Sequence, residues 1–230
     1  MTHGYYQLPT GRVAAIEGDC PFPLVTQALN DPNGLLAIGG DLSSTRLLSA
    51  YRQGIFPWFS ENEPILWWSP NPRMILFPDK LKISHSLKKT LKKNQFKIRF
   101  NTAFDEVISA CANTQRPKQH GTWITSEIKM AYSALHQAGF AVCAESWSEN
   151  TLVGGCYGVK IGRMFYGESM FYRTPDASKV AFVHLVEWLK SQHVGMIDCQ
   201  MNTAHLARFG ASQIPRHIFL EKLSQLISAT

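Results

Sequence analysis

The sequence predicts an α+β fold with a mixed sheet, and three features of its second half support this class. Three strand-like segments follow one another with short turns between them, which is typical of a meander. They lie at 140–147, 151–161 and 164–172. The next segment, 177–191, is too apolar for a single stripe, so we expect a helix buried on more than one side. A strand at 196–200 and a helix at 215–227 complete the α+β order.

The first half of the chain is expected to be loop-rich and aromatic, with one clear helix. That helix begins at Ser43 or Ser44 and ends at Gly54, with an apolar stripe between them. A Pro-rich hinge at 64–72 divides the chain into a small domain, 1–71, and a larger one, 72–230. After the hinge we expect a helix at 84–93, a strand at 96–100, a helix at 103–113, a loop at 113–121 and a helix at 126–138.

The composition indicates a globular protein. Of the 230 residues 45% are hydrophobic, yet no apolar run approaches the roughly 18 residues of a membrane span. The first residues lack the charged and apolar regions of a signal peptide, so we expect a cytoplasmic protein without a membrane partner. The five cysteines form no CxxC pair and the eight histidines show no metal-ligand spacing, so no metal site is expected.

Positive charge is concentrated in one segment. The net charge of the chain is +6, and residues 79–99 hold eight basic residues and one acid. Lys88, Lys89, Lys92 and Lys93 fall at helical i, i+4 spacing, where like charges repel one another. The segment is either a solvated helix face or a surface that binds phosphates, which would neutralise this crowding. The second interpretation favours a nucleic acid partner.

The predicted order of elements is also that of the acyl-CoA N-acetyltransferases. Those enzymes bind the CoA pyrophosphate on a glycine-rich turn that precedes the buried helix. The corresponding turn here, residues 173–178, reads RTPDAS and contains no glycine. We expect Asp176 to cap the helix, where its carboxylate would repel a pyrophosphate. The acyl group is therefore expected on another carrier, and the basic segment suggests a nucleic acid.

Long sequence blocks resemble the bacterial leucyl/phenylalanyl-tRNA-protein transferases over residues 21–215. The blocks are PNGLLAIGGDLSSTRLLSAYRQGIFPWFS, PILWWSPNPR, HGTWIT, LVGGCYGV, GESMF, ASKVAF and IDCQ. The resemblance implies transfer of leucine, phenylalanine or, less well, methionine from tRNA to proteins that begin with arginine or lysine, which marks them for N-end-rule degradation. It implies a monomer without a cofactor, in which a small N-terminal domain packs on an acyl-CoA N-acyltransferase-like (GNAT-like) domain.

Two polar residues on the strand at 196–200 are candidates for catalysis. Asp198 and Gln200 stand at i, i+2, so strand alternation points both to one face and points Ile197 and Cys199 to the other. By resemblance, Asp198 stabilises the attacking ammonium while Gln200 orients the amine or receives its proton. The alternative is that both only satisfy backbone groups at a strand end. Cys199, on the other face, is not expected to be a nucleophile.

Glu168 is an acid inside an otherwise apolar strand, where an unpaired carboxylate would be costly. It therefore needs a cation. Its partner is either Arg163, Arg173 or Lys179 of the same chain, or the basic side chain at the N-terminus of the acceptor. The family resemblance supports the acceptor.

The resemblance also implies binding residues for the donor. The aminoacyl pocket would be formed by Cys156, Phe182, Leu185, Leu189 and Ile197, although their spacing is equally that of core packing. The better-known members have methionine in place of Cys156 and phenylalanine in place of Leu185 and Leu189, so the resemblance leaves the ranking of the three donors open. Trp58 and Trp123 would contact the terminal adenosine. The tRNA phosphates would be bound by His85, Lys89, Lys92 and Lys93.

Two other functions remain open at this stage. One is an acyl-CoA-dependent N-acetyltransferase. The other is a non-catalytic RNA-binding protein, in which the lysines and tryptophans bind single strands. In each case Trp67 and Trp68 are expected to pack between the two domains.

Overall fold

The strand meander forms the centre of a seven-stranded sheet. In the computed structural model, which describes residues 4–114 and 122–228, strands β8 (Ala141–Ser148), β9 (Thr151–Ile161) and β10 (Met164–Tyr172) pair antiparallel. Strand β11 (Met196–Gln200) then pairs parallel with β10. The sheet is completed by β7 (Lys97–Phe100), β6 (Arg73–Leu76) and β12 (Ser212–Ile214). The predicted α+β class with a mixed sheet is confirmed.

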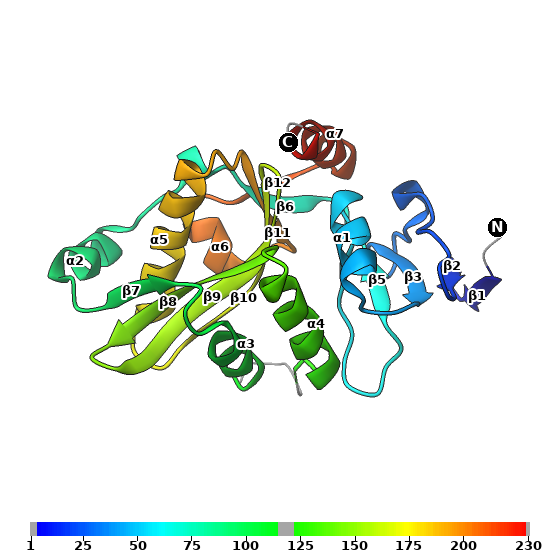
Figure 1. The fold of residues 1–230 in the computed structure, drawn as a ribbon. Coiled ribbons are helices and arrows are strands. Elements are labelled where there is room, and N and C mark those ends of the chain that lie inside the picture. Colours follow the sequence, from blue (N-terminus) through cyan, green and yellow to red (C-terminus); the bar gives the residue numbers. More distant parts are fainter. Residues whose placement is uncertain (1–3, 115–121, 229–230) are drawn as a thin grey trace.

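Helices cover both faces of this sheet, so its central strands are buried on both sides (Figure 1). Helix α5 (Ala177–Ser191) packs on one face, whereas α3 (Phe104–Ala112) and α4 (Ser126–Gln137) pack on the other. Alternation along β9 follows this division, because Cys156 belongs to the core cluster of α5 and Tyr157 to that of α3 and α4. The apolar α5 is buried on several sides, as its sequence predicts.

The remaining helices lie at the ends and edges of the sheet. Helix α2 (His85–Lys93) begins at Ser84, whose hydroxyl accepts a hydrogen bond from the Leu87 N–H at 3.2 Å. Helix α7 (Arg216–Ile227) ends the described chain. The 3-10 turn η2 (Pro78–Lys80) and the short helix α6 (Ala204–Arg208) were not expected, and neither were β6 and β12. The loop expected at 113–121 lies outside the described residues from 115 onward.

The N-terminal part, expected to be loop-rich with one helix, also contains a second sheet that the sequence did not predict. Five strands pair in the order β1-β2-β3-β5-β4. Their bounds are Gly4–Leu8, Gly11–Ile16, Leu35–Gly39, Phe56–Pro57 for β4 and Leu66–Trp68 for β5. Helix α1 (Ser44–Arg52) lies where the sequence predicts it, after the 3-10 turn η1 (Val25–Gln27). Strands of two to six residues are too short to show a clear alternation.

Asp176 does not cap α5 with its side chain, contrary to expectation. Its backbone is left-handed at φ 66°, and no side-chain cap hydrogen bond forms. The carboxylate instead accepts hydrogen bonds from Thr90 Oγ1 at 3.0 Å and from Lys179 Nζ at 2.7 Å. The left-handed turn therefore directs Asp176 toward α2, and its carboxylate ties α2 to the first turn of α5.

Trp67 belongs to the core of the N-terminal part. Its side chain is fully buried, its ring meets Phe22 edge-on with 4.8 Å between centroids, and its Nε1–H donates to the Gly39 carbonyl at 2.8 Å. Trp68 Nε1–H donates to the Trp58 carbonyl at 2.7 Å. These partners all lie within residues 1–71, so the contacts do not show the predicted packing between domains. Among the described helices, none has the length and apolar character to cross a membrane.

We predict that Trp67→Ala lowers the free energy of unfolding by about 3–5 kcal/mol, because it leaves a large cavity and an unpaired carbonyl. Trp58→Ala, which removes a side chain that is 37% exposed, is the matched control and should cost clearly less. Urea unfolding of both variants checks this. Equal losses from the two variants would contradict the assignment of Trp67 to the core.

Candidate active site

An apolar cavity of about 350 Å³ opens between α5 and the meander. Four of the five residues predicted for the aminoacyl pocket line it, namely Cys156, Phe182, Leu185 and Ile197. Leu189 does not, because it is fully buried one turn further along α5. We call this space the apolar cavity. Its walls are β9, β10, α5, β11 and the segment from Thr203 to Leu206.

Sequence reasoning missed the wall supplied by Thr203, His205 and Leu206. These residues begin the five-residue helix α6, which is too short for a periodic signal. His205 Nε2 is buried and has no hydrogen-bond partner within the described residues. Burial lowers the pKa of His205, and the charges of Lys179 and Arg208 lower it further. The imidazole is therefore neutral at pH 7.

A second cavity of about 250 Å³ adjoins the first. The two share a wall made by Gly167, Glu168, Cys199, Thr203 and Leu206. The second cavity, which we call the aromatic cavity, is also lined by Phe56, Pro57, Trp58, Trp123, Gln200 and Met201. It thus brings together the two tryptophans that the sequence assigned to one ligand from segments 65 residues apart.

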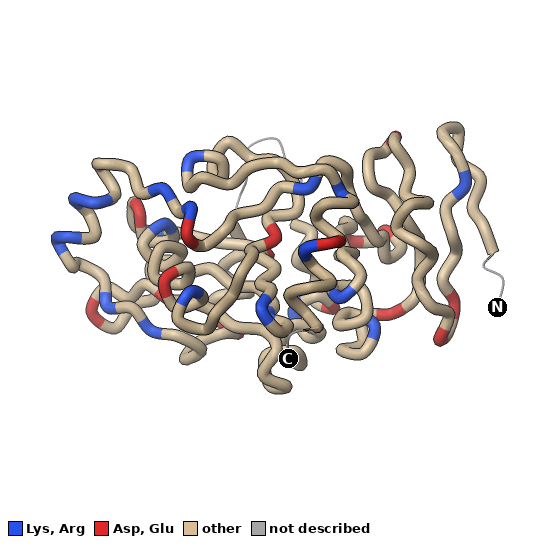
Figure 2. The backbone as a smooth tube through the Cα atoms, turned by 90° about the horizontal axis from the view of Figure 1, so that it is seen from above, with Lys and Arg blue, Asp and Glu red and all other residues tan. Residues whose placement is uncertain are grey.

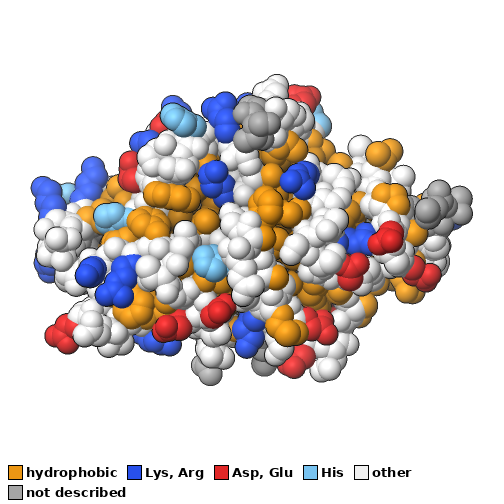
Figure 3. Space-filling model, in the orientation of Figure 1, with side chains coloured by type: hydrophobic (Ala, Val, Ile, Leu, Met, Phe, Trp, Pro, Cys, Tyr) orange, Lys and Arg blue, Asp and Glu red, His pale blue; other side chains and the backbone are white. Residues whose placement is uncertain are grey.

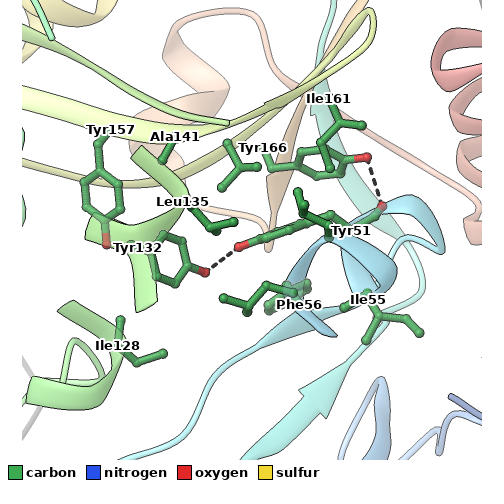
Figure 4. Close-up of a cluster of buried hydrophobic side chains, with 14 of the residues drawn as sticks. Tyr51, Ile55, Phe56, Ile128, Tyr132, Leu135, Ala141, Tyr157, Ile161 and Tyr166 are labelled. Carbon is green, nitrogen blue, oxygen red and sulfur yellow. Dashed lines mark hydrogen bonds between the residues drawn. The ribbon is translucent and has the colours of Figure 1, made fainter. Parts of the chain in front are cut away.

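Glu168 stands in the shared wall and is held by three donors. Tyr51 Oη donates to Oε1 at 2.7 Å, Tyr132 Oη donates to Oε2 at 3.2 Å, and Gln200 Nε2 donates to Oε1 at 3.1 Å. The Tyr132 hydroxyl also lies within hydrogen-bond distance of the Tyr51 hydroxyl, so its single proton is shared between Glu168 and Tyr51 Oη, and Tyr166 Oη donates to the Tyr51 carbonyl at 2.9 Å (Figure 4). The three partners of Glu168 come from α1, α4 and β11.

The intrachain cations proposed for Glu168 are engaged elsewhere. Arg163 and Arg173 donate to the carbonyls of His193 and Leu152, and Lys179 pairs with Asp176. No Lys or Arg forms a salt bridge with Glu168 within residues 4–114 and 122–228. The hydrogen-bond partners of the Glu168 carboxyl are therefore all uncharged, and the carboxyl lies in the wall of both cavities. A cation that enters either cavity could form an ion pair with it.

Burial raises the pKa of Glu168 to about 7. Hydrogen bonds from the two tyrosines and from Gln200 lower this pKa, and the negative charge of Asp198 raises it. The two protonation states are therefore both populated near neutral pH. A cation bound at Glu168 would favour the ionised state.

Asp198 is not among the residues that line the two cavities, so its contact with an acceptor ammonium stays a prediction. Its side chain is fully buried and accepts two hydrogen bonds from Arg73, Nε to Oδ1 at 2.8 Å and Nη2 to Oδ2 at 2.7 Å. The register of β11 shifts between Asp198 and Gln200, and Gln200 has a φ of 61°. This bulge ends the alternation that placed both side chains on one face. Ile197, predicted for the aminoacyl pocket, lines the apolar cavity, and Cys199, predicted for the same strand face, lines it too.

Cys199 lines both cavities, yet it is a poor nucleophile. Burial and the neighbouring Asp198 raise the pKa of its thiol, so the thiolate is absent at neutral pH. Burial raises the pKa of the Cys156 thiol in the same way. Within the described residues no three His, Cys, Asp or Glu side chains are placed to hold a metal ion.

The predicted phosphate-binding residues lie together on α2. His85, Lys89, Lys92 and Lys93 are exposed, and none of them forms an ion pair with a described residue. Figure 2 shows several Lys and Arg positions along the backbone at this end of the molecule, opposite the N-terminus, and Figure 3 shows Lys and Arg side chains on its surface there. The lysine patch is therefore a solvated face whose charges are available to a polyanion.

The comparison with protein families gives two matches. Residues 75–224 match the family described as "Leucyl/phenylalanyl-tRNA protein transferase". Residues 40–71 match the "Leucyl/phenylalanyl-tRNA protein transferase N-terminal domain".

Curated relatives match over nearly their whole length. A leucyl/phenylalanyl-tRNA--protein transferase of Nitrosomonas eutropha is 58% identical over 214 residues, which cover 93% of this chain and 91% of the relative. One of Chromobacterium violaceum is 60% identical over 204 residues, covering 89% and 87%.

Solved structures are only weakly similar. L-PGS from Bacillus licheniformis aligns with a TM-score of 0.42 at 11% identity, covering 82% of this chain and 71% of that one. A GCN5-related N-acetyltransferase from Kribbella flavida aligns with a TM-score of 0.36 at 7% identity, covering 72% and 59%. Scores this low carry no argument about function.

The raised pKa of Glu168 predicts how stability depends on pH. The folded protein binds a proton more tightly than the unfolded chain, so the contribution of Glu168 is complete below its ordinary pKa and is lost as pH rises through about 7. Relative to Glu168→Gln, the wild-type free energy of unfolding should fall by at most about 1.4 kcal/mol per pH unit between pH 5 and 8.

Urea unfolding across this pH range measures the difference. Glu221→Gln changes an exposed acid on α7 and should follow the wild-type curve. Parallel curves for the wild type and Glu168→Gln would show that Glu168 titrates normally.

Proposed function

Because the chain belongs to the leucyl/phenylalanyl-tRNA protein transferase family, and so transfers an amino acid from tRNA to a protein N-terminus, we propose which substrates it takes and where. The donors are leucine, phenylalanine and, less well, methionine. The acceptors begin with arginine or lysine and are marked by the transfer for N-end-rule degradation. The observation that carries this proposal is the wall shared by an apolar and an aromatic cavity, with a carboxyl group of raised pKa in it.

The apolar cavity takes the side chain of the donor. Cys156, Phe182, Leu185 and Ile197 offer it an apolar surface, and burial of an apolar side chain there contributes binding free energy. A side chain that is not branched at Cβ and has the size of leucine, phenylalanine or methionine suits a space of about 350 Å³. Leu189 supports this wall from behind, since it belongs to the same core cluster.

Glu168 takes the basic side chain at the acceptor's N-terminus. It is partly exposed, it has no cationic partner among the described residues, and its tyrosine partners fix its position. A guanidinium or ammonium group in this wall would form charge-assisted hydrogen bonds with the carboxylate. The acceptor's α-amine would then lie near Gln200, beside the mouth of the apolar cavity.

The reaction itself demands little beyond positioning. The donor is an activated ester, and the pKa of an α-amine is about 7.7 to 8.0, so a share of roughly a quarter is already neutral near pH 7.5. Holding amine and ester in attack geometry can supply about 7 to 11 kcal/mol of the barrier. Gln200 lines the aromatic cavity and orients the amine, and no cofactor is required. Cytoplasm is the compartment that supplies aminoacyl-tRNA.

The rest of the donor lies over the aromatic cavity and the lysine patch. Trp58 and Trp123 offer ring faces to the terminal adenosine, since base stacking on aromatic side chains is worth about 1–3 kcal/mol per base. His85, Lys89, Lys92 and Lys93 of α2 meet phosphates of the tRNA body without reading base identity.

We further propose the division into domains 1–71 and 72–230 and a monomeric, GNAT-like arrangement. The division is supported by the separation of the two sheets between Trp68 and Arg73. The fold is supported by the order meander, buried helix α5 and parallel strand β11. The turn before α5 has no glycine, which speaks against CoA as the donor.

One assay tests the substrates against the alternatives. The protein is incubated with labelled Phe-tRNA, or with labelled acetyl-CoA, and a peptide that begins with arginine. We expect label only from Phe-tRNA. Label from acetyl-CoA would support an N-acetyltransferase, and tRNA binding without transfer would support an RNA-binding protein.

Glu168→Gln should remove the preference for basic acceptors. The ratio of kcat/KM for peptides that begin with arginine and alanine should fall roughly 10- to 100-fold, the worth of a hydrogen bond to a charged group. Glu221→Gln makes the same charge change away from the cavities and should keep the wild-type ratio. An unchanged ratio in Glu168→Gln would assign acceptor selection to another group.

Cys156→Met and Leu185→Phe should shift donor preference from phenylalanine toward leucine. Both changes place a larger side chain in the apolar cavity, and such a pocket discriminates by about 1–3 kcal/mol per methylene. Competition between Leu-tRNA and Phe-tRNA measures the shift. Leu189→Phe lies outside the cavity lining and is the control; a larger shift from Leu189→Phe would contradict the assigned pocket.

A further inference from the structure

Arg73 is a buried cation whose role is not explained by the substrates. It is the first residue of β6 and has no exposed surface. Its guanidinium lies between two rings, 4.8 Å from the centroid of Phe56 and 4.7 Å from that of Phe219. Both rings hold the plane of the group, because a guanidinium stacks on aromatic faces. These contacts join the N-terminal sheet, β6 and α7 at one point.

The planar fork of Arg73 fixes the carboxylate of Asp198. Nε and Nη2 bind the two oxygens at 2.8 and 2.7 Å, a bidentate geometry that leaves the carboxylate one orientation. Oδ1 also accepts the backbone N–H of Gln200 at 2.9 Å. Asp198 therefore joins Arg73 to the backbone of a residue that lines the aromatic cavity.

The bond from Asp198 supports an unfavourable backbone conformation at Gln200. A φ of 61° lies in the left-handed region, which residues other than glycine adopt at a cost. In this conformation the Gln200 side chain leaves the strand alternation and its Nε2 comes to 3.1 Å from Glu168 Oε1. The position of the Gln200 amide in the shared wall thus depends on the bulge that Asp198 stabilises.

We propose that Arg73 is a positioning residue for aminoacyl transfer, and that it acts on Gln200 through Asp198. The inference rests on the proposed function of Gln200 in orienting the acceptor amine. Asp198 is then a positioning residue as well, since it does not reach the cavities.

Stability alone does not account for the pair. Replacing a buried ion pair by apolar residues of similar volume is often neutral or stabilising, because desolvation offsets the attraction of the charges. Arg73 Nη1 is buried without a hydrogen-bond partner among the described residues, which adds to this cost. A packing role would be served as well by an apolar side chain. The orientation of Gln200 requires the acceptor oxygen of Asp198 and the fork that holds it.

A double-mutant cycle between Arg73 and Gln200 tests the inference. Arg73→Lys keeps the charge but loses the bidentate fork, and it should lower kcat for transfer from Phe-tRNA roughly 10- to 100-fold. KM for Phe-tRNA should change little, since the donor pocket is intact. In the Gln200→Ala background, Arg73→Lys should have almost no further effect, because the side chain it positions is gone.

The matched control is Arg46→Lys. Arg46 is also a buried arginine, bound to the carbonyls of Cys20 and Gly18, but it has no contact with the site. It should lower stability without changing kcat at a temperature where the variant is folded, as near-UV circular dichroism shows. If Arg73→Lys does not fold, the double variant Arg73→Met, Asp198→Asn takes its place in the same cycle. This double variant leaves no buried charge at the position of the ion pair.

Other results would contradict the inference or the proposed function on which it rests. An equal loss of kcat in both backgrounds, or a loss of stability with unchanged kcat, rejects Arg73 as a positioning residue. Normal transfer by Gln200→Ala rejects the role of Gln200 and, with it, this inference. If the wild type itself transfers nothing to a peptide that begins with arginine, the proposed acceptor class fails instead.

Discussion

The site depends on the hydrogen bonds that hold the Glu168 carboxyl. Its donors, Tyr51, Tyr132 and Gln200, come from α1, α4 and β11, so the carboxyl joins the N-terminal part of the chain to the larger sheet and to the helix α4 that covers one of its faces. A buried carboxyl without such donors would stay protonated or unfold the wall around it. With them it has a pKa of about 7 and one fixed position. The proposed places of the donor and of the acceptor are both defined relative to this carboxyl group.

In the proposed function, the two cavities on either side of this wall have different tasks. The apolar cavity would select a donor by volume and Glu168 would select an acceptor by charge, and the two cavities share the wall in which Glu168 lies. Positioning suffices for a reaction between an activated ester and a partly neutral amine. This explains why buried thiols, which remain protonated, and metal-ligand clusters need not take part. In the proposed mechanism the position of Gln200 matters for the reaction, and this gives a reason for the buried ion pair of Arg73 and Asp198 that stabilises its backbone.

Periodicity predicted the elements that are long or strongly patterned. The meander, α5, α2 and β11 lie where the sequence places them. The N-terminal strands, β6, β12 and α6 were missed because segments of two to six residues carry too little pattern. At the site, Glu168 was found as a misplaced acid and Gln200 as a strand-end amide. The expectation that Asp198 and Gln200 share one face was wrong, because a bulge between them turns Gln200 out of the alternation, and a bulge depends on pairing with β6, which no alternation rule contains.

The most direct test of the account is a crystal structure of the protein with puromycin, an analogue of the aminoacylated adenosine. We predict that its aromatic side chain enters the apolar cavity against Phe182 and Ile197, while its base lies beside Trp58 and Trp123, leaving Glu168 open to an acceptor. A structure with the base in the apolar cavity, or with the aromatic side chain between the tryptophans, would contradict the assignment of both cavities.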